Sequence, residues 1–429
     1  MLEEIKILEI LNEWKKLWKK KILEREISEK IINATKSTKE IIDIIGVRRS
    51  GKSSLLGLII QKLKLNDELV LYINFEEPAF LNYYNLELLE QILEIYKTNI
   101  NPTKKPYIFL DEIQLITGWE KWVRKLRDLE TAHIFVSGSS SKLLSREFGT
   151  TLTGRHISFT IFPLNFKEYI TFKGENLPKN ISELIEKKII FKKLLNSYLI
   201  EGGFPEVIIT NNKDLLKNYF EDIIYKDIVL RHQIRDVKSL RNLANFCLTN
   251  ISNLITYNSL KNNFKISLDS TRDYLYYMEE AFLIFQIPKF SYSLKEQEIN
   301  PKKIYCIDNG LRNAVSFKFS KDEGKLAENL VFIELKRRNK DIYYWKNPQH
   351  EEVDFLIKTG NRIGVIIQVC YDIYDFNVKK RELRPLLKAS KELKCNNLLV
   401  ITEDYEAEEK YNGKRIKYQP LWKWLLENT

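Results

Sequence analysis

The sequence of 429 residues is poor in the residues that cross-link or break a chain. Its four cysteines, at positions 247, 306, 370 and 395, form no C-x-x-C pair, which argues against a disulfide framework or a zinc ribbon and fits a reducing compartment. Glycine (15) and proline (11) are too sparse for a collagen-like repeat or a long flexible linker. No apolar run approaches the roughly 18–20 residues of a membrane-spanning helix. The acidic start MLEEIK is unlike a signal peptide.

These absences predict a cytoplasmic protein of several domains that does not associate with membranes. Hydrophobic residues make up 44% of the chain, which is enough for a sizeable core. Lys and Arg outnumber Asp and Glu by 69 − 58 = 11. Such a positive balance permits an acidic partner such as nucleic acid, although it does not specify a fold.

Short β-branched runs alternate with helical stretches between residues 41 and 162. The runs lie at 41–45, 69–75, 107–111, 133–138 and 156–162. This alternation is typical of a parallel sheet with crossover helices. The chain is therefore predicted to divide into an N-terminal helix (1–35), an α/β core (36–163), a mainly helical segment (164–235), a segment of short helices with a strand (236–300), and a second, smaller α/β domain (301–429).

Residues 46–53, GVRRSGKS, match the pattern G-x-x-x-x-G-K-[ST] of a phosphate-binding loop. Glycines allow backbone N–H groups to approach phosphate oxygens, the lysine brings a point charge to the β- and γ-phosphates, and the serine hydroxyl can ligate Mg²⁺. A strand-like run precedes the loop and a helical one follows it. We expect ATP and Mg²⁺ as cofactors. The predicted nucleotide-binding residues are Gly46, Val47, Arg48, Arg49, Ser50, Gly51, Lys52, Ser53 and Ser54.

The apolar run YIFLDE (107–112) ends in two acids, Asp111 and Glu112. In ATPases with such a loop, the first acid holds Mg²⁺, and an adjacent glutamate can take a proton from the attacking water. We therefore predict Ser53 and Asp111 as metal ligands and Glu112 as the catalytic base. The alternative is that both acids are solvated carboxylates at the end of a buried strand.

Two further positions have weaker signals. Ser137 or Ser139, after the run 133–138, would contact the γ-phosphate or the water, or would instead cap the next helix. Arg155 would sense a phosphate in its own or a neighbouring subunit, or would be an ordinary surface arginine. The sequence does not choose between these alternatives.

The order of the motifs resembles that of AAA+-type ATPases, common in archaea and also found in bacteria, in which the core is followed by a winged helix and a restriction-endonuclease-like domain. The resemblance covers about residues 36–375. It implies an α/β fold with a P-loop NTPase core on a parallel sheet, a helical lid, a winged-helix segment and a C-terminal restriction-endonuclease-like α/β domain. It also implies that Asp111 is the Mg²⁺ acid, Glu112 the catalytic acid, and Ser139 or a neighbour the sensor serine. The matching stretches are GVRRSGKSSLL, YIFLDEIQ, VSGSSSKLLSRE, LTGRHISFTIFPLNFKEY, YLIEGGFPEV, YKDIVLRHQI and YCIDNGL.

The winged-helix resemblance places a second helix at 267–280 and a wing with lysines 289, 295, 302 and 303. This helix exposes Asp269, Asp273, Glu279 and Glu280 and only one basic residue, Arg272, so it is a poor surface for phosphate. We expect any DNA binding to be nonspecific; a lid or a protein-docking module is the alternative. The basic segment EWKKLWKKKILER near the N-terminus is expected to pack its tryptophans and leucines on the adjacent domain rather than to lie on a membrane.

The C-terminal segment has acids at 328, 334 and 354 in helix–strand order, as in restriction-endonuclease-like domains. Such enzymes place an Asp on one strand and an acid-x-Lys on the next. Here Asp354 is present, but Gln368 replaces the acid and Cys370 replaces the lysine. We therefore do not expect DNA cleavage, although Lys379 or Lys380 is a candidate for a lysine that has changed position.

Together these features predict an ATPase that acts as a molecular switch or remodelling factor on DNA or on a protein, with homo-oligomerisation left open. The alternative from another class is a DNA-binding module of a mobile-element or defence system. In that module nucleotide would gate DNA engagement and turnover would be negligible.

Overall fold

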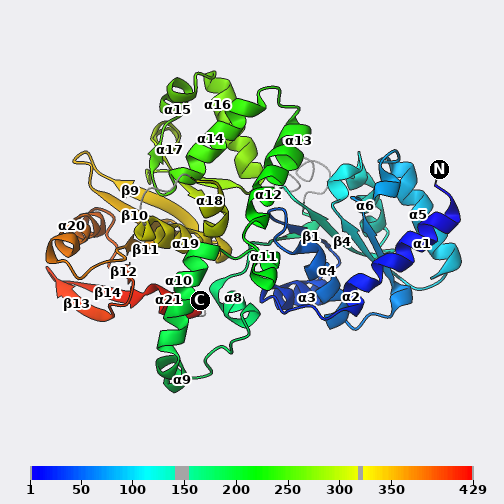
Figure 1. The fold of residues 1–429 in the computed structure, drawn as a ribbon, viewed down its shortest axis with the longest axis horizontal. Helices are drawn as coiled ribbons and strands as arrows, with labels where there is room; N and C mark the ends of the chain where they lie inside the picture. The colour runs from blue at the N-terminus through cyan, green and yellow to red at the C-terminus, as the bar shows by residue number, and fades with distance from the viewer. Residues whose placement is uncertain (1, 141–153, 317–321, 428–429) are drawn as a thin grey trace. The chain divides into compact units, whose positions relative to one another are not determined.

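The computed structural model describes residues 2–140, 154–316 and 322–427 (Figure 1). The chain folds into two compact units, Met1–Phe162 and Pro163–Thr429, which are described separately below. In the described parts of the chain, no helix is long and apolar enough to cross a bilayer.

The first unit is built on a five-stranded parallel sheet with the strand order β2-β3-β4-β1-β5 (Figure 1). All four strand pairs are parallel, so the carboxyl ends of the strands meet at one edge of the sheet. The predicted α/β core with a parallel sheet is confirmed. The strands are β1 (Ile41–Ile45), β2 (Val70–Asn74), β3 (Tyr107–Asp111), β4 (His133–Gly138) and β5 (His156–Thr160).

Crossover helices α4 (Lys52–Lys62), α5 (Leu86–Asn99) and α6 (Trp119–Asp128) connect the strands. The N-terminal segment, expected to be one helix, forms α1 (Glu4–Trp14), α2 (Lys16–Lys19) and α3 (Ile27–Ser37) instead. Trp14 and Trp18 lie against Tyr72 of β2, with ring centroids 5.5 and 6.0 Å apart. The expected packing of this segment on the core is therefore confirmed.

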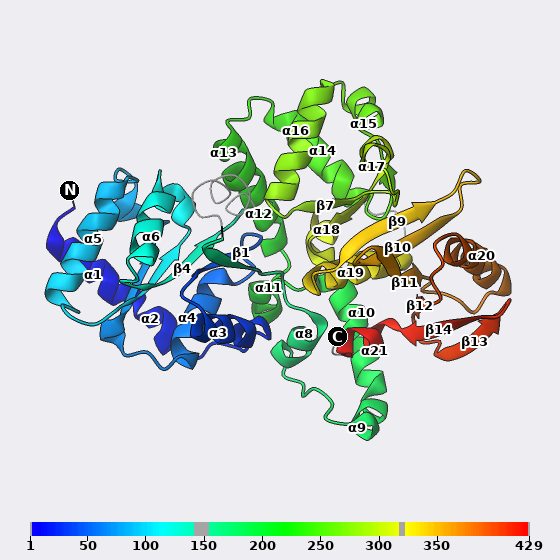
Figure 2. The ribbon, with the colours of Figure 1, turned by 180° about the vertical axis from the view of Figure 1, so that it is seen from behind.

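The second unit begins with helices, which are seen from behind in Figure 2. They are α8 (Phe166–Phe172), α9 (Ile181–Glu186), α10 (Lys188–Glu201), α11 (Pro205–Thr210), α12 (Leu215–Asp222), a π-helical stretch (Ile223–Val229) and α13 (Leu230–His232). Four more helices and a three-stranded antiparallel sheet of order β6-β8-β7 follow. These are α14 (Val237–Thr249), β6 (Leu254–Ile255), α15 (Tyr257–Phe264), α16 (Leu268–Glu280), β7 (Ile284–Ile287), α17 (Leu294–Ile299) and β8 (Lys302–Cys306).

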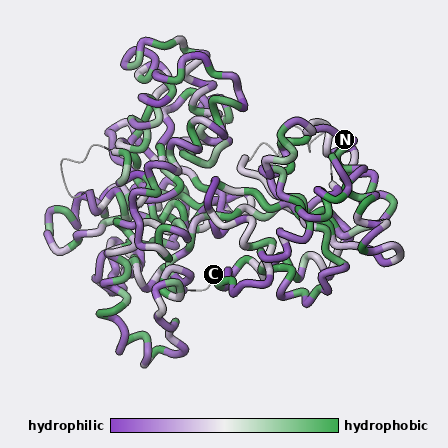
Figure 3. The backbone as a smooth tube through the Cα atoms, turned by 45° about the vertical axis from the view of Figure 1, so that its right-hand side comes forward, coloured by the Kyte–Doolittle hydropathy of each residue, from purple (hydrophilic) through white to green (hydrophobic). Residues whose placement is uncertain are grey.

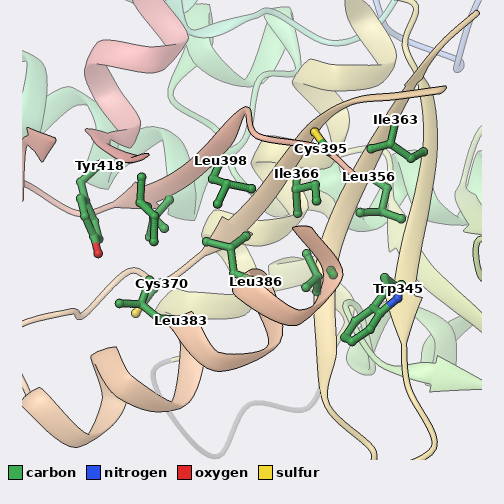
Figure 4. Close-up of a cluster of buried hydrophobic side chains, with 14 of the residues drawn as sticks. Trp345, Leu356, Ile363, Ile366, Cys370, Leu383, Leu386, Cys395, Leu398 and Tyr418 are labelled. Carbon is green, nitrogen blue, oxygen red and sulfur yellow. The ribbon is translucent and has the colours of Figure 1, made fainter. Parts of the chain in front are cut away.

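The C-terminal part of the second unit contains a six-stranded mixed sheet of order β13-β14-β12-β11-β10-β9. Helix α20 (Phe376–Glu392) covers one face of it, and Leu386 of this helix lies beside Leu398 and Ile366 of the strands (Figure 4). The strands are β9 (Asp341–Lys346), β10 (Glu352–Thr359), β11 (Arg362–Val369), β12 (Leu398–Thr402), β13 (Ala407–Tyr411) and β14 (Lys414–Pro420). The helices are α18 (Asn309–Val315), α19 (Glu323–Arg337), α20 (Phe376–Glu392) and α21 (Leu421–Leu426).

The distribution of hydropathy follows this architecture. Along many helices the tube in Figure 3 alternates between hydrophilic and hydrophobic residues, as expected for helices with one buried face. The strand β1 is different, because all five of its residues are buried. A strand buried on both faces is typical of a parallel sheet covered by helices on both sides.

A buried carboxylate, Asp308, joins the end of α10 to the start of α18 within the second unit. Its oxygens accept hydrogen bonds from the backbone N–H of Gly203 at 2.6 Å and of Leu311 at 2.9 Å. A Cβ atom at Gly202 would lie 2.0 Å from the Asp308 carboxylate, so a larger residue does not fit there. Burial raises the pKa of Asp308 to about 6, despite these hydrogen bonds. The sequence stretches YLIEGGFPEV and YCIDNGL thus meet in one structural junction.

Replacement of Asp308 by alanine is expected to destabilise the second unit. Two buried N–H groups would lose their acceptor, and each such loss costs about 1–3 kcal/mol. The midpoint of urea unfolding, followed by circular dichroism on the full chain, should therefore fall clearly for Asp308→Ala. Asp269→Ala is the matched control, because the Asp269 side chain is 91% exposed. An equal midpoint for the two variants would contradict the role of this junction.

Candidate nucleotide-binding site

The phosphate loop connects β1 to α4 and has the backbone that its glycines were expected to allow. Gly46 has φ of +154°, and a Cβ atom there would lie only 2.1 Å from the carbonyl oxygen of Ile161. Arg49 and Gly51 adopt left-handed φ values of 68° and 96°. Left-handed residues within a loop let successive N–H groups converge on an anion. Helix α4 starts directly after the loop, at Lys52, and adds the favourable dipole of its N-terminus.

The Lys52 ammonium is held beside this loop. Its side chain is 4% exposed, and its Nζ atom contacts the carbonyl oxygens of Gly46 at 3.2 Å and Val47 at 3.4 Å. The same Nζ atom lies 3.5 Å from a carboxylate oxygen of Glu112. The structure therefore brings together the loop and the acidic strand end, which are about 60 residues apart in sequence.

Asp111 is fully buried at the end of β3 and is surrounded by hydroxyl groups. The hydroxyl of Tyr72 donates to one of its carboxylate oxygens at 2.6 Å, and Ser137 donates to the other. The Ser53 hydroxyl is also hydrogen-bonded to this carboxylate. Burial and the neighbouring Glu112 charge raise the pKa of Asp111, while these hydrogen bonds oppose the rise. Ser53 and Asp111, both predicted as metal ligands, are thus in contact.

Glu112 has the electrostatic surroundings of a base that stays ionised. Burial on its own would raise its pKa, but the charges of Lys52 and Arg48 outweigh burial, and the pKa of Glu112 is lowered. Its backbone has a left-handed φ of 55°, and its N–H donates to Ser137 Oγ at 3.1 Å. Gln114 donates to its carboxylate at 2.5 Å. Glu112 is therefore an anion at neutral pH, as proton acceptance from water requires.

The two weaker sequence candidates differ in their surroundings. Ser137 contacts both acids, as described above, and Ser139 is buried just after β4. Arg155 forms an ion pair with Asp128, with its Nε atom 3.2 Å from the carboxylate. The remainder of the serine-rich motif, residues 141–147, lies outside the described residues.

Two residues of the site had no clear signal in the sequence. Arg25, between α2 and α3, donates to the carbonyl oxygen of Ser50 at 2.9 Å and to that of Phe162 at 2.8 Å. It thereby ties the phosphate loop to the chain that follows β5. Tyr72 is one aromatic residue in an apolar strand, and only the packing of β2 beside β3 places its hydroxyl on Asp111.

The residues fit the phosphates of a nucleotide with Mg²⁺. The Ser50 hydroxyl in the loop is buried and has no hydrogen-bond partner in the described structure, so it is available to a ligand. A hydroxyl and a carboxylate, as at Ser53 and Asp111, are the hard oxygen ligands that Mg²⁺ prefers, with substrate phosphates and water completing its shell. No group of three or more His, Cys, Asp or Glu side chains able to hold a metal ion occurs in the parts that the structure describes.

Three family models match the chain. Residues 38–170 match an AAA domain, residues 192–322 a domain of unknown function (DUF8612), and residues 323–424 a second domain of unknown function (DUF4143). The AAA domain thus contains the phosphate loop, both acids and all five strands of the parallel sheet.

Similar proteins occur in archaea and bacteria. The uncharacterized protein MJ1544 of Methanocaldococcus jannaschii is 39% identical over 95% of this chain and 92% of its own length. An uncharacterized protein of Haemophilus influenzae is 29% identical over 91% of this chain and 96% of its own length. Among solved structures, the Walker-type ATPase PABY2304 of Pyrococcus abyssi aligns with 68% of this chain and 96% of its own, at 15% identity and a TM-score of 0.45.

Replacement of Lys52 by alanine is expected to weaken ATP binding about 10- to 100-fold. The reason is the loss of charge-assisted hydrogen bonds to phosphate, worth about 1.5–3 kcal/mol. Titration of a fluorescent ATP analogue in the presence of Mg²⁺ measures the change. Lys125→Ala removes an equal charge from an exposed position on α6 and should bind as the parent chain does. Equal affinities for Lys52→Ala and the parent chain would show that the loop does not bind phosphate.

Proposed function

Because this chain belongs to the same family as MJ1544 of M. jannaschii and contains an AAA domain, we propose that it is a Mg²⁺-dependent ATPase that acts as a molecular switch or remodelling factor. The observation that carries the proposal is the meeting of Lys52, Asp111 and Glu112 at one edge of the parallel sheet. Each has a neighbour that suits its role: loop carbonyls hold the ammonium, hydroxyls surround the buried acid, and two cations keep the second acid ionised.

In the proposed mechanism the phosphates of ATP bind to the loop 46–54 and to the ammonium of Lys52. Ser53 and Asp111 would hold a Mg²⁺ ion, which would neutralise charge on the phosphates. The Glu112 carboxylate accepts a proton from the attacking water. Ser137, which donates to Asp111 and accepts from the N–H of Glu112, is placed to register a change at either acid. We favour Ser137 over Ser139 as the sensor for this reason.

We propose that the second unit transmits the nucleotide state. Its first helices would form the lid, α14 to β8 a winged helix, and the six-stranded sheet with its helices a restriction-endonuclease-like domain. Three helices, α14 to α16, and three antiparallel strands, β6 to β8, support the winged helix; a fourth, short helix, α17, lies between β7 and β8. The surface of α16 supports only a weak role in DNA binding, since Asp269 at its start is 91% exposed and the one basic residue, Arg272, is near Asp269.

Replacement of Glu112 by glutamine is expected to preserve ATP affinity and to reduce multiple-turnover hydrolysis by at least about 100-fold, because an amide does not accept the proton and base catalysis contributes about 10²–10⁴-fold. Phosphate release under saturating ATP is the measurement. Glu130→Gln is the control, because Glu130 is an exposed glutamate paired with Lys39. Hydrolysis by Glu112→Gln at the parent rate would refute the assignment of the base. Negligible turnover by the parent chain would favour the nucleotide-gated DNA-binding module instead.

Binding to duplex DNA, where it occurs, is expected to be nonspecific and strongly dependent on salt. The chain carries a net charge of +11, but α16 exposes Asp269 and Asp273 beside its single basic residue. Contrary to the expectation from the sequence, Glu280 of this helix is buried and Glu279 is only partly exposed, because it accepts hydrogen bonds from Gln286. Counterion release then dominates, and log affinity falls by about 0.9 per phosphate contact for each log unit of salt. Fluorescence anisotropy with two unrelated duplexes between 50 and 200 mM salt (roughly the range over which such binding collapses) should give similar affinities for both. A strong preference for one duplex, lost in Arg272→Ala, would instead identify α16 as a sequence reader.

A further inference from the structure

The ammonium of Lys303 lies among three carboxylates inside the second unit. Its Nζ atom is 2.9 Å from an oxygen of Glu328, 2.8 Å from one of Glu352 and 2.8 Å from one of Asp354. The Lys303 side chain is 2% exposed. The lysine comes from β8 of the three-stranded sheet, Glu328 from α19, and the other two acids from β10 of the six-stranded sheet.

The sequence predicted Lys303 on a hairpin wing, and the structure shows that its side chain is buried. In the structure β8 pairs with β6 and β7, and Lys302 and Lys303 are both buried. The side chain of Lys303 therefore faces the acids of the neighbouring sheet rather than a DNA backbone. The alternation of buried and exposed residues along a strand could not predict these contacts, because the partner acids lie 25 to 51 positions further along the chain.

The other candidate lysines lie elsewhere. Lys379 contacts Glu409 at 2.7 Å and lies over the rings of Tyr405 and Tyr418, and Lys380 is exposed. Glu334 is paired with Arg337 and Arg338. The expected lysine position is filled by Cys370, which belongs to the hydrophobic cluster beneath α20 (Figure 4).

Gln368, at the position of the second acid, is engaged by protein groups at both ends of its amide. Its oxygen accepts from the backbone N–H of Asp354 at 3.3 Å, and its nitrogen donates to Glu382 at 2.8 Å. The second oxygen of Asp354 accepts from the backbone N–H of Val369 at 2.9 Å. These hydrogen bonds occupy the oxygen atoms of Gln368 and Asp354 that a bound metal ion would need.

A divalent cation does not fit this centre while Lys303 occupies it. Mg²⁺ requires oxygens at about 2.0–2.1 Å and Ca²⁺ at about 2.3–2.6 Å, and both would need the oxygens that already bind the ammonium. A second cation at the same carboxylates would also be repelled by the first. The residues present therefore do not fit the metal that a restriction-endonuclease-like domain implies.

We propose that Lys303 is the resident cation of this centre, in place of a divalent metal, and that it joins the three-stranded sheet to the six-stranded sheet. The comparison with a metal site rests on the proposed endonuclease-like domain, but the contacts do not. One ammonium offsets part of the charge of three acids. Tyr305 stabilises the Glu328 carboxylate by a hydrogen bond at 2.7 Å, and the ammonium of Lys346, 3.6 Å from Glu352, offsets more of the negative charge.

The proposal makes the centre inert toward both metal and DNA. Without a bound divalent ion, no water is activated beside Asp354 and no phosphodiester is polarised. The centre would also stabilise the packing of three elements, because one side chain of β8 binds acids of both α19 and β10. Removal of the ammonium would leave the three acids without their cation. They do not form a metal site as they stand, so a hard divalent cation would bind only if their oxygens moved closer together.

The test is Mn²⁺ binding followed by electron paramagnetic resonance, without nucleotide. The chain carries Asp111→Asn throughout, so that the phosphate-loop site does not contribute. We expect no Asp354-dependent Mn²⁺ binding by this parent chain and about one bound Mn²⁺ per chain after Lys303→Met. The added ion should be lost again on Asp354→Asn. Lys303→Arg keeps the charge and should bind no more Mn²⁺ than the parent.

Three results would overturn the proposal. The first is Mn²⁺ bound by the parent chain and released by Asp354→Asn. The second is plasmid cleavage by the unmodified chain in Mg²⁺ or Mn²⁺ that Asp354→Asn abolishes. The third is a folded Lys303→Met chain that binds no additional Mn²⁺. If Lys303→Met does not fold, the parent and Asp354→Asn measurements still decide the question. ATP turnover is a separate readout, so failure of the ATPase proposal does not affect this test.

Discussion

The contact between Gly46 and the carbonyl of Ile161 is the constraint on which the candidate nucleotide site depends. Because β1 lies between β4 and β5, the chain that leaves β1 must pass directly beside the end of β5, and a side chain at position 46 would collide with it. Arg25 fastens the same region by donating to Ser50 and Phe162 on either side. The loop is thus shaped by packing before any ligand binds, which lowers the ordering cost of binding.

The parallel sheet then determines which side chains meet the loop. Strand β1 is hydrogen-bonded to β4, and β4 to β3, so the residues that end these strands share one edge. Asp111 and Ser137 come from neighbouring strands and touch, and Lys52 reaches Glu112 from the start of α4. Ligand sites in open parallel sheets form at the carboxyl ends of strands for this geometrical reason.

Two buried lysine–carboxylate centres among the described residues have opposite properties. The ammonium of Lys52 lies 3.5 Å from one carboxylate, that of Glu112, and its other contacts are with loop carbonyl oxygens. It can therefore exchange these contacts for phosphate oxygens. Lys303 is opposite three acids at 2.8–2.9 Å, and these contacts saturate its three N–H donors. The number of carboxylates around each ammonium therefore decides whether its N–H groups are available to a ligand, as at Lys52, or are all bound by the protein, as at Lys303.

The sequence by itself determined the local features: the five strands of the core, the phosphate loop with its glycines, and the acids that end β3. These follow from short-range rules, because a glycine pattern, a β-branched run and a helix start are read from neighbouring residues. Only the tertiary structure decided the roles of Arg25, Tyr72 and Lys303. Each of these side chains binds a group many residues away in the sequence. Which group it reaches depends on how its helix or strand packs, and this cannot be predicted from the residue type alone.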